Sequence, residues 1–455
     1  MPVLHWTQHF GGADAGLWRT TNLVLHIASA SAAGLLCRDM TQKAIAGAVG
    51  FAVFLLIPWS PEVVIWLVGR FDGWATLGVL LSLWAAHKSR GVDRWWAVSL
   101  VAGACAYASK ESALILPLWV AVIALFASYR EASGDTSPKN VLGTLLKKRG
   151  PLLIAHALLA VAYLLWRATL FSTSSLNVYA TGPELGVPQL ASQLWAHLQF
   201  PLGLVSLAPM VAWVVAVSFV SLIVIALRNK QPSCVAIGIL LLVTVVAAVA
   251  IYFSVAPGEG DGYRLYYLST IGFALIAASA STSPARITPV VIVALLAAMV
   301  FWQARVTDEW QRASNDMKAA ERELSRTASA MVPQDYGLVL LPDHLGHVPF
   351  ARNAQGALPK LAGLAAPTFD VLSRLVVFTP PQIDEWHRLT QEGVVRKITS
   401  RSDAPPNPTL YFCFDSRTQR LRALGYWATG TLDDWRRKWR ESVAAACPQV
   451  ATAKG

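Results

Sequence analysis

The sequence predicts an all-α polytopic membrane domain of about ten transmembrane helices over residues 1–304, followed by a small extracytoplasmic α/β domain over residues 305–455. Three observations favour this fold class. Hydrophobic residues make up 55% of the chain and charged residues only 14%, whereas a soluble globular protein carries about 25% charged residues. The apolar residues gather between positions 20 and 304, and the 18 tryptophans suit the aromatic belts at membrane–water interfaces.

Apolar segments carry the predicted helices, and several are shorter than the ~20 residues that cross a bilayer upright. We therefore expect the helix bounds to differ from the apolar bounds by a few residues. The segments lie at 17–37, 43–57, 71–88, 95–109, 112–128, 151–171, 209–227, 234–256, 265–281 and 287–304.

Basic residues mark every second loop between these segments. The net charge of +11 therefore reflects the positive-inside rule, by which Lys and Arg gather in cytoplasmic loops, rather than nucleic-acid binding. The residues concerned are Arg38 and Lys43; Lys88, Arg90 and Arg94; Arg130, Lys139, Lys147, Lys148 and Arg149; Arg228 and Lys230; and Arg286.

The same alternation predicts which segments lie outside the cytoplasm, most simply across a bacterial inner membrane. Residues 1–16 lack the basic start and the continuous apolar run of a cleavable signal peptide. A chain that begins outside without such a peptide leads us to expect a further helix upstream of Met1. The predicted outer segments are 1–16, 58–70, 110–111, 172–208, 257–264 and the tail from 305.

Ionisable and aromatic residues gather in these outer loops. Glu62, Arg70 and Asp72 lie between two apolar segments, where hydrocarbon would cost each about 2.5–3.5 kcal/mol, so they must face water or line a site. The inner face shows no comparable cluster in the sequence. The other outer residues of interest are Lys110, Glu111, Tyr179, Glu184, Trp195, His197, Glu259, Asp261, Tyr263, Arg264, Tyr266 and Tyr267.

Several of these residues also have a structural interpretation. Glu62 and Asp72 could be a general base and its partner, but Asp72 could equally cap the next membrane helix. Arg70 and Arg264 could hold the phosphate of a lipid-linked donor in a two-point fork, or could bind ordinary lipid headgroups. Both interpretations stay open from the sequence.

Three further assignments are alternatives of the same kind. Lys110 and Glu111 either pair with each other or lie buried near the site. Trp195 and His197 are favoured as interfacial anchors, while the loop 172–208 around them is a candidate lid. The glycine-rich residues 257–262 predict a flexible loop rather than a phosphate-binding one, because no strand and helix follow in the required order.

The tail begins with a polar helix predicted to continue the last membrane helix outward. Short β-like runs follow at 336–342, 374–380 and 409–415, and a closing helix is expected at 432–447. Cys413 and Cys447 are expected to form a disulfide in an oxidising outer compartment. The remaining cysteines, Cys37, Cys105 and Cys234, are predicted to be packed thiols.

Four short motifs follow one another through about residues 17–282. They are Thr21-Asn22-Leu23-Val24-Leu25-His26; Pro58, Glu62, Trp66, Gly69, Arg70 and Asp72; Ser109-Lys110-Glu111 with Pro117; and Arg264-Leu265-Tyr266-Tyr267. Their order and spacing resemble the GT-C class of integral-membrane glycosyltransferases. The nearest resemblance is to bacterial relatives of protein O-mannosyltransferases and of the transmembrane-and-tetratricopeptide mannosyltransferases.

The resemblance implies transfer of a sugar from a polyprenyl-phosphate donor to a glycan, lipid or protein acceptor at the outer membrane face. It implies that carboxylates activate the acceptor hydroxyl and that basic residues stabilise the departing phosphate. The expected partners are these substrates and membrane lipids, and no nucleic acid. No cofactor is certain, and dependence on a divalent metal stays open. The implied roles are catalytic for Glu62 and Asp72, phosphate-binding for Arg70, Lys110 and Arg264, and acceptor- or site-lining for Glu111, Tyr263 and Tyr266.

Two departures from the family pattern bear on activity. The relatives read HPxxxE where this chain has Ile57 in place of the histidine, and their acidic outer loop follows a first helix that has no counterpart here. The alternative is therefore a non-catalytic membrane protein, either an inactive relative or a carrier of lipid-linked sugars. A carrier would place ionisable residues near the bilayer midplane. A scaffold role for the tail is a third possibility.

Overall fold

The computed structural model describes the helical part of the chain almost continuously and the tail in short stretches. The described residues divide between two compact units, Met1–Thr307 and Asp308–Gly455. They are 15–66, 69–132, 137–170, 209–229, 231–252 and 263–330, parts of 191–198, and in the tail 336–340, 344–345, 348–349, 375–378, 409–415, 417–426 and parts of 441–447.

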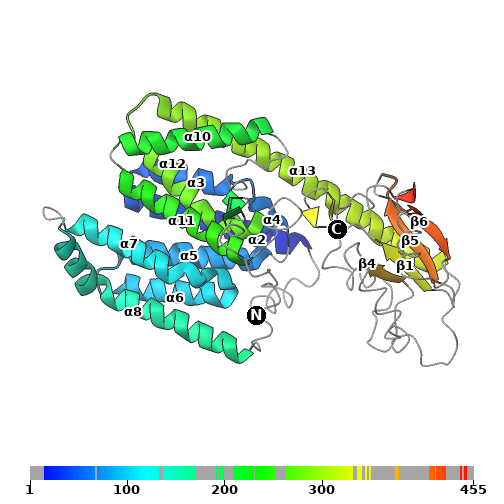
Figure 1. Cartoon of the computed structure of the whole chain (residues 1–455), viewed down its shortest axis with the longest axis horizontal. Coiled ribbons are helices and arrows are strands. Elements are labelled where there is room, and N and C mark those ends of the chain that lie inside the picture. The colour runs from blue at the N-terminus through cyan, green and yellow to red at the C-terminus, as the bar shows by residue number, and fades with distance from the viewer. Residues whose placement is uncertain are drawn as a thin grey trace. The chain divides into compact units, whose positions relative to one another are not determined.

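The first unit consists of packed helices (Figure 1). Each predicted apolar segment overlaps one of them. The helices are α2 (Ala15–Thr41), α3 (Ala44–Leu55), α4 (Ser60–Ile65), α5 (Arg70–Lys88), α6 (Arg94–Ser109), η2 (Glu111–Ile115), α7 (Leu116–Glu131), α8 (Pro138–Leu170), α10 (Pro209–Arg228), α11 (Pro232–Tyr252), η4 (Tyr263–Ser269), α12 (Thr270–Ser281) and α13 (Ile287–Ala330).

Among the described residues, five helical spans are long and apolar enough to cross a membrane. Others are short: α3 and α12 have 12 residues each, about 18 Å at 1.5 Å per residue, against a hydrocarbon core of about 30 Å. The number of about ten membrane helices therefore stays a prediction. The five spans are Gly16–Thr41, Glu111–Glu131, Pro138–Thr169, Pro232–Val249 and Ile287–Thr327.

The expected start of the sixth apolar segment was wrong. A loop was predicted up to Gly150, but α8 begins at Pro138 and runs for 33 residues. The stretch Pro138–Arg149 is rich in Leu and Lys, which favour a helix, and Pro138 stands at the first helical position, where proline fits. The basic residues therefore lie on the first turns of a helix rather than in a loop.

The prediction that the last membrane helix continues into the polar segment is confirmed. Helix α13 has 44 residues, about 66 Å in length. Its first half is apolar and its second half carries mixed charge, including the exposed i,i+4 pair Asp308–Arg312. Pro289 lies in the first turn of α13, and no proline or glycine follows it up to Ala330. The helix therefore has no local reason to end at the change of composition.

The core of the helical unit is built around α12. Residues Thr270–Ala280 are all buried, and α12 packs against α2, α3, α10 and α11. A Cβ added at Gly272 would lie 2.4 Å from the carbonyl oxygen of Gly238 in α11. The two backbones are thus in direct contact, an approach that only small residues permit between membrane helices.

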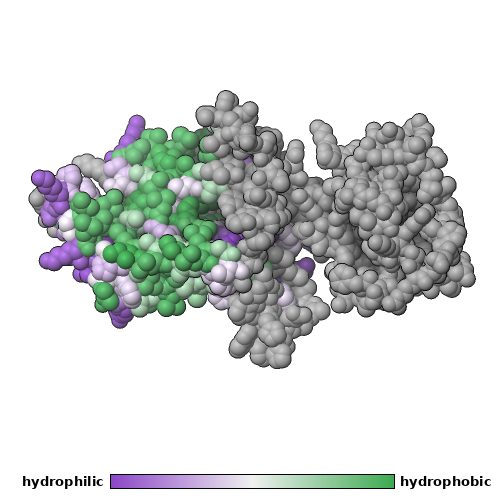
Figure 2. Space-filling model, turned by 60° about the horizontal axis from the view of Figure 1, so that its bottom comes forward, coloured by the Kyte–Doolittle hydropathy of each residue, from purple (hydrophilic) through white to green (hydrophobic). Residues whose placement is uncertain are grey.

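Apolar side chains cover the outside of the unit. Figure 2 shows hydrophobic residues over most of its visible described surface, with hydrophilic ones projecting at the left of the view. Leu158 and Leu165 of α8, Trp213 of α10 and Val293 of α13 are all more than 60% exposed. Water would disfavour such a surface, whereas lipid would cover it, so the exterior fits a membrane protein.

A polar network crosses the apolar interior between α5, α6 and α8. His156 Nε2 and Ser99 Oγ are 2.9 Å apart, and Ser99 Oγ donates to the carbonyl oxygen of Ser82 at 2.9 Å. All three residues are buried. Buried polar groups are costly unless they are hydrogen-bonded, so this network fixes the register of three helices.

The second unit contains a small mixed sheet. Strands β1 (Tyr336–Leu340), β4 (Leu375–Phe378) and β5 (Thr409–Asp415) lie within the three predicted runs and are parallel, while β6 (Arg420–Tyr426) is antiparallel to β5. The order is β4-β1-β5-β6. Strands β2 (His344–Leu345) and β3 (Val348–Pro349) form a separate pair. Most of the predicted helix 432–447 lies outside the described residues.

Strand β6 was not predicted because its charged residues mask the alternating pattern. It follows a turn held by Asp415, whose carboxylate accepts the backbone N–H of Arg417 at 3.0 Å and the hydroxyl of Thr418 at 2.9 Å. The expected disulfide is confirmed: Cys413 of β5 is bonded to Cys447, and both are fully buried. Cys37 and Cys234 are buried as predicted, but Cys105 is exposed on the apolar exterior.

We expect Gly272→Ala to lower the free energy of unfolding by about 1–3 kcal/mol, because one of the two touching backbones must move. The matched control is Gly143→Ala in α8, where nothing lies within 4 Å of the added methyl group. That change should raise stability by up to about 1 kcal/mol, since alanine favours a helix more than glycine does. Denaturation of the detergent-solubilised protein, followed by tryptophan fluorescence, measures both. Equal effects would contradict the close contact.

Candidate functional site

The predicted site residues lie at one end of the helical unit, here called the Glu62 end. It comprises α4, the start of α5, the η2 and η4 turns, and the first turns of α2. Helix α4 contacts α2, α5 and η4, and α5 contacts η2 and η4. Segments separated by more than 200 positions in the sequence are therefore neighbours at this end.

Glu62 joins α4 to η4. Its side chain is 2% exposed, and its Oε2 accepts the backbone N–H of Arg264 at 2.9 Å. The Nε of Arg264 lies 3.7 Å from Oε1 of the same carboxylate, and the guanidinium stacks 4.0 Å from the ring centroid of Trp66. Glu62 is thus a buried carboxyl group that positions Arg264, whose side chain is 22% exposed.

Asp72 pairs with Lys110. The ammonium of Lys110, in the residue before η2, donates to Oδ1 of Asp72 in the first turn of α5. The N-cap of α5 is Gly69, so the carboxylate of Asp72 serves an ion pair rather than the cap. The alternative in which Lys110 pairs with Glu111 is wrong, because Glu111 lies 3.8 Å from Arg167 of α8 instead.

Arg70 is covered by an aromatic ring. Its guanidinium lies 3.8 Å from the ring centroid of Trp18 and its Nη2 lies 3.5 Å from the carbonyl oxygen of the same residue. Arg70 is only 1% exposed. Stacking on an aromatic face suits a desolvated guanidinium, so in this state Arg70 is held between α2 and α5.

Two residues of α2 hold the backbone beneath these side chains. The amide of Asn22 donates to the carbonyl oxygens of Val63, Val64 and Trp66 at 3.0–3.3 Å. These carbonyls lie at the end of α4, where a helix leaves its last carbonyls without partners. Asn22 therefore fixes the turn between Glu62 and Arg70.

His26 lies one turn further along α2. Its Nε2 lies 3.0 Å from the carbonyl oxygen of Leu55, which can only accept, so this nitrogen carries a proton. Its Nδ1 lies 2.6 Å from the hydroxyl of Tyr267 and, in the neutral ring, accepts from it. The imidazole thereby ties α2 to both the end of α3 and η4.

The tyrosines of η4 differ in what they contact. The hydroxyl of Tyr266 hydrogen-bonds Nδ1 of His197, and both residues are buried. The prediction of an interfacial anchor is therefore wrong for His197, whereas Trp195 is 58% exposed, as an anchor requires. The side chain of Tyr263, and most of the candidate lid 172–208 and the glycine-rich loop, lie outside the described residues.

The structure thus brings most of the predicted site residues to one end but sorts them into separate contacts. Glu62 meets Arg264, Asp72 meets Lys110, Arg70 meets Trp18, and Glu111 turns to Arg167. The part of the chain that is described contains no group of three His, Cys, Asp or Glu side chains close enough to hold a metal ion.

Sequence reasoning missed Trp18 and Gln303. Gln303 of α13 donates to the hydroxyl of Ser60 at 2.9 Å and so braces the start of α4. The available signal for Gln303 was its polar amide directly after the apolar run 287–302. Trp18 had none, because it is one of 18 tryptophans in a chain where interfacial tryptophans are expected.

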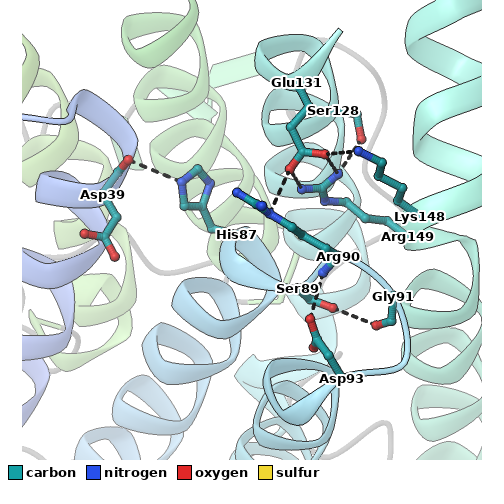
Figure 3. A network of polar contacts seen from close by, with 10 residues as sticks. All are labelled: Asp39, His87, Ser89, Arg90, Gly91, Asp93, Ser128, Glu131, Lys148 and Arg149. Carbon is teal, nitrogen blue, oxygen red and sulfur yellow. Dashed lines mark hydrogen bonds and ion pairs between the residues drawn. The ribbon is translucent and has the colours of Figure 1, made fainter.

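A second polar cluster lies at the opposite end of the helical unit, here called the basic end. The expectation that this face holds no comparable cluster is wrong. Asp39, His87, Arg90, Arg94, Arg130 and Glu131 lie there around a pocket of about 950 Å³. These residues come from α2, α5, α6, α7 and the loop between α5 and α6, so only folding assembles them. Figure 3 shows the polar contacts of Asp39, His87, Arg90 and Glu131.

Long apolar helices, an apolar exterior and polar clusters at both ends of the first unit are the features of a polytopic membrane protein. Comparison of the chain with protein-family models, with curated proteins and with solved structures finds no match. The function must therefore be inferred from the residues themselves.

The Asp72–Lys110 pair should show strong energetic coupling. We expect Asp72→Asn and Lys110→Met each to lower the free energy of unfolding by about 2–3 kcal/mol, because each leaves the other charge desolvated and unpaired. The double variant should cost less than the sum of the two. The exposed pair Asp308–Arg312 is the matched control, with an expected coupling below about 0.5 kcal/mol. Additive effects of Asp72→Asn and Lys110→Met would show that the pair is not formed.

Proposed function

We propose that this protein is a membrane glycosyltransferase of the GT-C type, which transfers a sugar from a polyprenyl-phosphate donor to an acceptor at the outer face of the membrane. The observation that carries the proposal is the grouping of Glu62, Asp72, Arg70, Lys110 and Arg264 at one end of an apolar helical unit. Acids and cations desolvated side by side at a membrane surface fit the departure of a phosphate and the activation of a hydroxyl.

Arg264 and Lys110 are the better placed to hold the donor phosphate. Their side chains are 22% and 19% exposed, and each is oriented by a buried carboxylate. Arg264 can bind two phosphate oxygens at once, while Lys110 adds a single positive charge. Arg70 would join them only if Trp18 uncovered its guanidinium.

Asp72 is the better placed to act on the acceptor. Among the described residues, its carboxylate accepts a side-chain hydrogen bond from Lys110 alone. It therefore keeps acceptor capacity for a hydroxyl group. Glu62 is bound on one oxygen by a backbone N–H and lies close to the guanidinium of Arg264. We assign Glu62 to positioning Arg264, and Glu111 and Tyr266 to the wall of the acceptor site.

Sidedness is the first requirement of this function. The loops rich in Lys and Arg gather at the basic end, which the positive-inside rule assigns to the cytoplasm, so the Glu62 end is assigned to the outside. The disulfide Cys413–Cys447 supports an oxidising, extracytoplasmic location for the tail unit. A bacterial inner membrane suits both assignments.

A carrier or an inactive relative is the second candidate. The observation that favours it is that both buried carboxylates already have cationic partners within the protein. Such a protein would bind the lipid-linked sugar without transferring it. Retention of the donor by the purified protein with no product formed would select this candidate over the enzyme.

Cysteine labelling tests the sidedness. In a chain whose native thiols Cys37, Cys105 and Cys234 are replaced by serine, we expect Glu111→Cys to react with a membrane-impermeant maleimide in intact cells. Arg286→Cys, exposed at the basic end, should react only after the cells are opened. Labelling of both positions in intact cells would place the two ends on the same side and end the proposal.

A transfer assay tests the chemistry. In membranes supplied with a radiolabelled polyprenyl-phosphate sugar, Arg264→Ala should lower the transfer rate at least about 100-fold, because the leaving phosphate loses a charge-assisted contact. Arg264→Lys should recover part of the rate, since it keeps the charge but not the two-point geometry. Asp72→Asn should also lower the transfer rate about 100-fold, because the acceptor hydroxyl loses its general base.

The matched control is Arg286→Ala, which removes an exposed arginine from the opposite end and should leave the rate unchanged. Expression and detergent stability of each variant are measured in parallel to separate lost chemistry from lost folding. Full activity after Arg70→Ala and Arg264→Ala are combined would exclude the phosphate-binding assignment.

A further inference from the structure

The pocket at the basic end has no part in the proposed transfer reaction. It has a volume of about 950 Å³ and is lined from α2, α5, α6, α7 and the loop between α5 and α6. Figure 3 shows the polar contacts beside it, which come from helices far apart in the sequence. A volume of this size is in the range of pockets that hold small-molecule ligands.

The carboxylates of this cluster are already neutralised by neighbouring cations. Glu131 lies 2.6 Å from Arg149 Nη2, 3.1 Å from Lys148 Nζ and 3.8 Å from Arg90 Nε. One carboxylate thus meets three cations, of which Arg149 is fully buried. Glu131 therefore has no charge left to balance the other arginines of the pocket.

The two aspartates are occupied as well. Asp39 lies 2.8 Å from Arg38 and 3.0 Å from Lys88. Asp93 is the N-cap of α6 and accepts the backbone N–H groups of Arg90 and Trp96 at 3.0 and 2.8 Å. Partial burial alone would raise the pKa of Asp93, but these backbone hydrogen bonds lower it below its usual range. Asp93 is thus an anion committed to the helix start.

Arg94 and Arg130 remain without an acidic partner in the described part of the chain. Arg130 donates to the carbonyl oxygen of Met40, and Arg94 lies 5.1 Å from the ring centroid of Trp95. Both line the pocket and both are exposed to it or to solvent. With the cations on Glu131 and Asp39 included, seven cations meet three carboxylates here, which leaves an excess of four positive charges.

The rim of the pocket is aromatic and apolar. Lys88 Nζ lies 4.8 and 5.1 Å from the ring centroids of Trp84 and Trp95, and Val92, in the loop between Arg90 and Asp93, is 73% exposed. Tryptophan beside lysine and an exposed valine is an arrangement that suits the boundary between lipid headgroups and hydrocarbon. In a pocket that opens to water alone, these exposed apolar side chains would be disfavoured.

We propose that this pocket binds a phosphate-bearing anion, held by Arg94 and Arg130, and that the headgroup of an anionic lipid supplies it. Guanidinium groups match phosphate oxygens in geometry and charge. Basic pockets between membrane helices on the cytoplasmic side suit anionic headgroups, and the rim described above lets acyl chains leave toward the apolar exterior. The bound lipid would tie α2, α5, α6 and α7 together at the end opposite the Glu62 cluster.

The test uses the full chain, purified in a mild detergent and offered phosphatidylglycerol, phosphatidylcholine or inorganic diphosphate. We expect the wild type to retain phosphatidylglycerol in preference to phosphatidylcholine, as measured by native mass spectrometry, and to gain thermal stability from it. Arg94→Gln combined with Arg130→Gln should weaken this binding about tenfold or more, because two charge-assisted contacts are lost. The matched control is Arg228→Gln combined with Arg286→Gln, which removes the same charge at the same end but outside the pocket, and should stay within about twofold of wild type.

The outcomes separate the sources of phosphate. Diphosphate binding that depends on Arg94 and Arg130, without a preference for phosphatidylglycerol, would keep the anion site and overturn the lipid as its ligand. No preference of the wild type for any phosphate probe would overturn the whole proposal, as would equal binding by the pocket variant and the control. If the double variant is unfolded, Arg94→Gln alone, which removes only an exposed side chain, is expected to weaken binding severalfold.

Discussion

The carboxylate of Glu62 is the buried charge on which the Glu62 end depends. It is 2% exposed in a unit whose surroundings are apolar, where an unpaired carboxylate is strongly disfavoured. Its partners are the backbone and the guanidinium of Arg264, which is 202 positions away. The need to satisfy this one charge thus brings α4 and η4 together. Asp72 and Lys110 form their ion pair at the same end of the unit.

At the basic end, buried charges are also paired, but the numbers of cations and carboxylates differ. Arg149 is fully buried and is held by Glu131 and by the hydroxyl of Ser128 at 3.1 Å. Cations nevertheless outnumber carboxylates there. The first end therefore presents oriented acids and bases suited to chemistry, while the basic end presents excess positive charge suited to holding an anion. The apolar middle parts of the helices separate the two ends.

The tail unit follows rules of soluble proteins. Three parallel strands and one antiparallel strand form its sheet, and Phe412 and Phe414 of β5 are buried on it. The disulfide closes 34 positions of chain, which stabilises a small unit mainly by restricting its unfolded state. Its polar helical segment is continuous with the last membrane helix through α13.

The sequence by itself determined the apolar helical segments, the β-runs of the tail and the Cys413–Cys447 pairing. The alternation of the loops in sidedness is a prediction from the same sequence. These features depend on local composition, period and charge, which are written in consecutive residues. It also indicated most of the site residues, because an ionisable residue between apolar segments stands out wherever it occurs.

Only the tertiary structure decided which of these groups meet. That Lys110 takes Asp72 rather than Glu111, that Trp18 covers Arg70, and that His197 is buried against Tyr266 depend on contacts between distant segments. The basic-end pocket escaped the sequence for the same reason: its arginines resembled ordinary cytoplasmic loop residues, and their excess over nearby carboxylates exists only once four helices have packed. Pairing of charges is a property of three-dimensional distance, which a linear pattern does not carry.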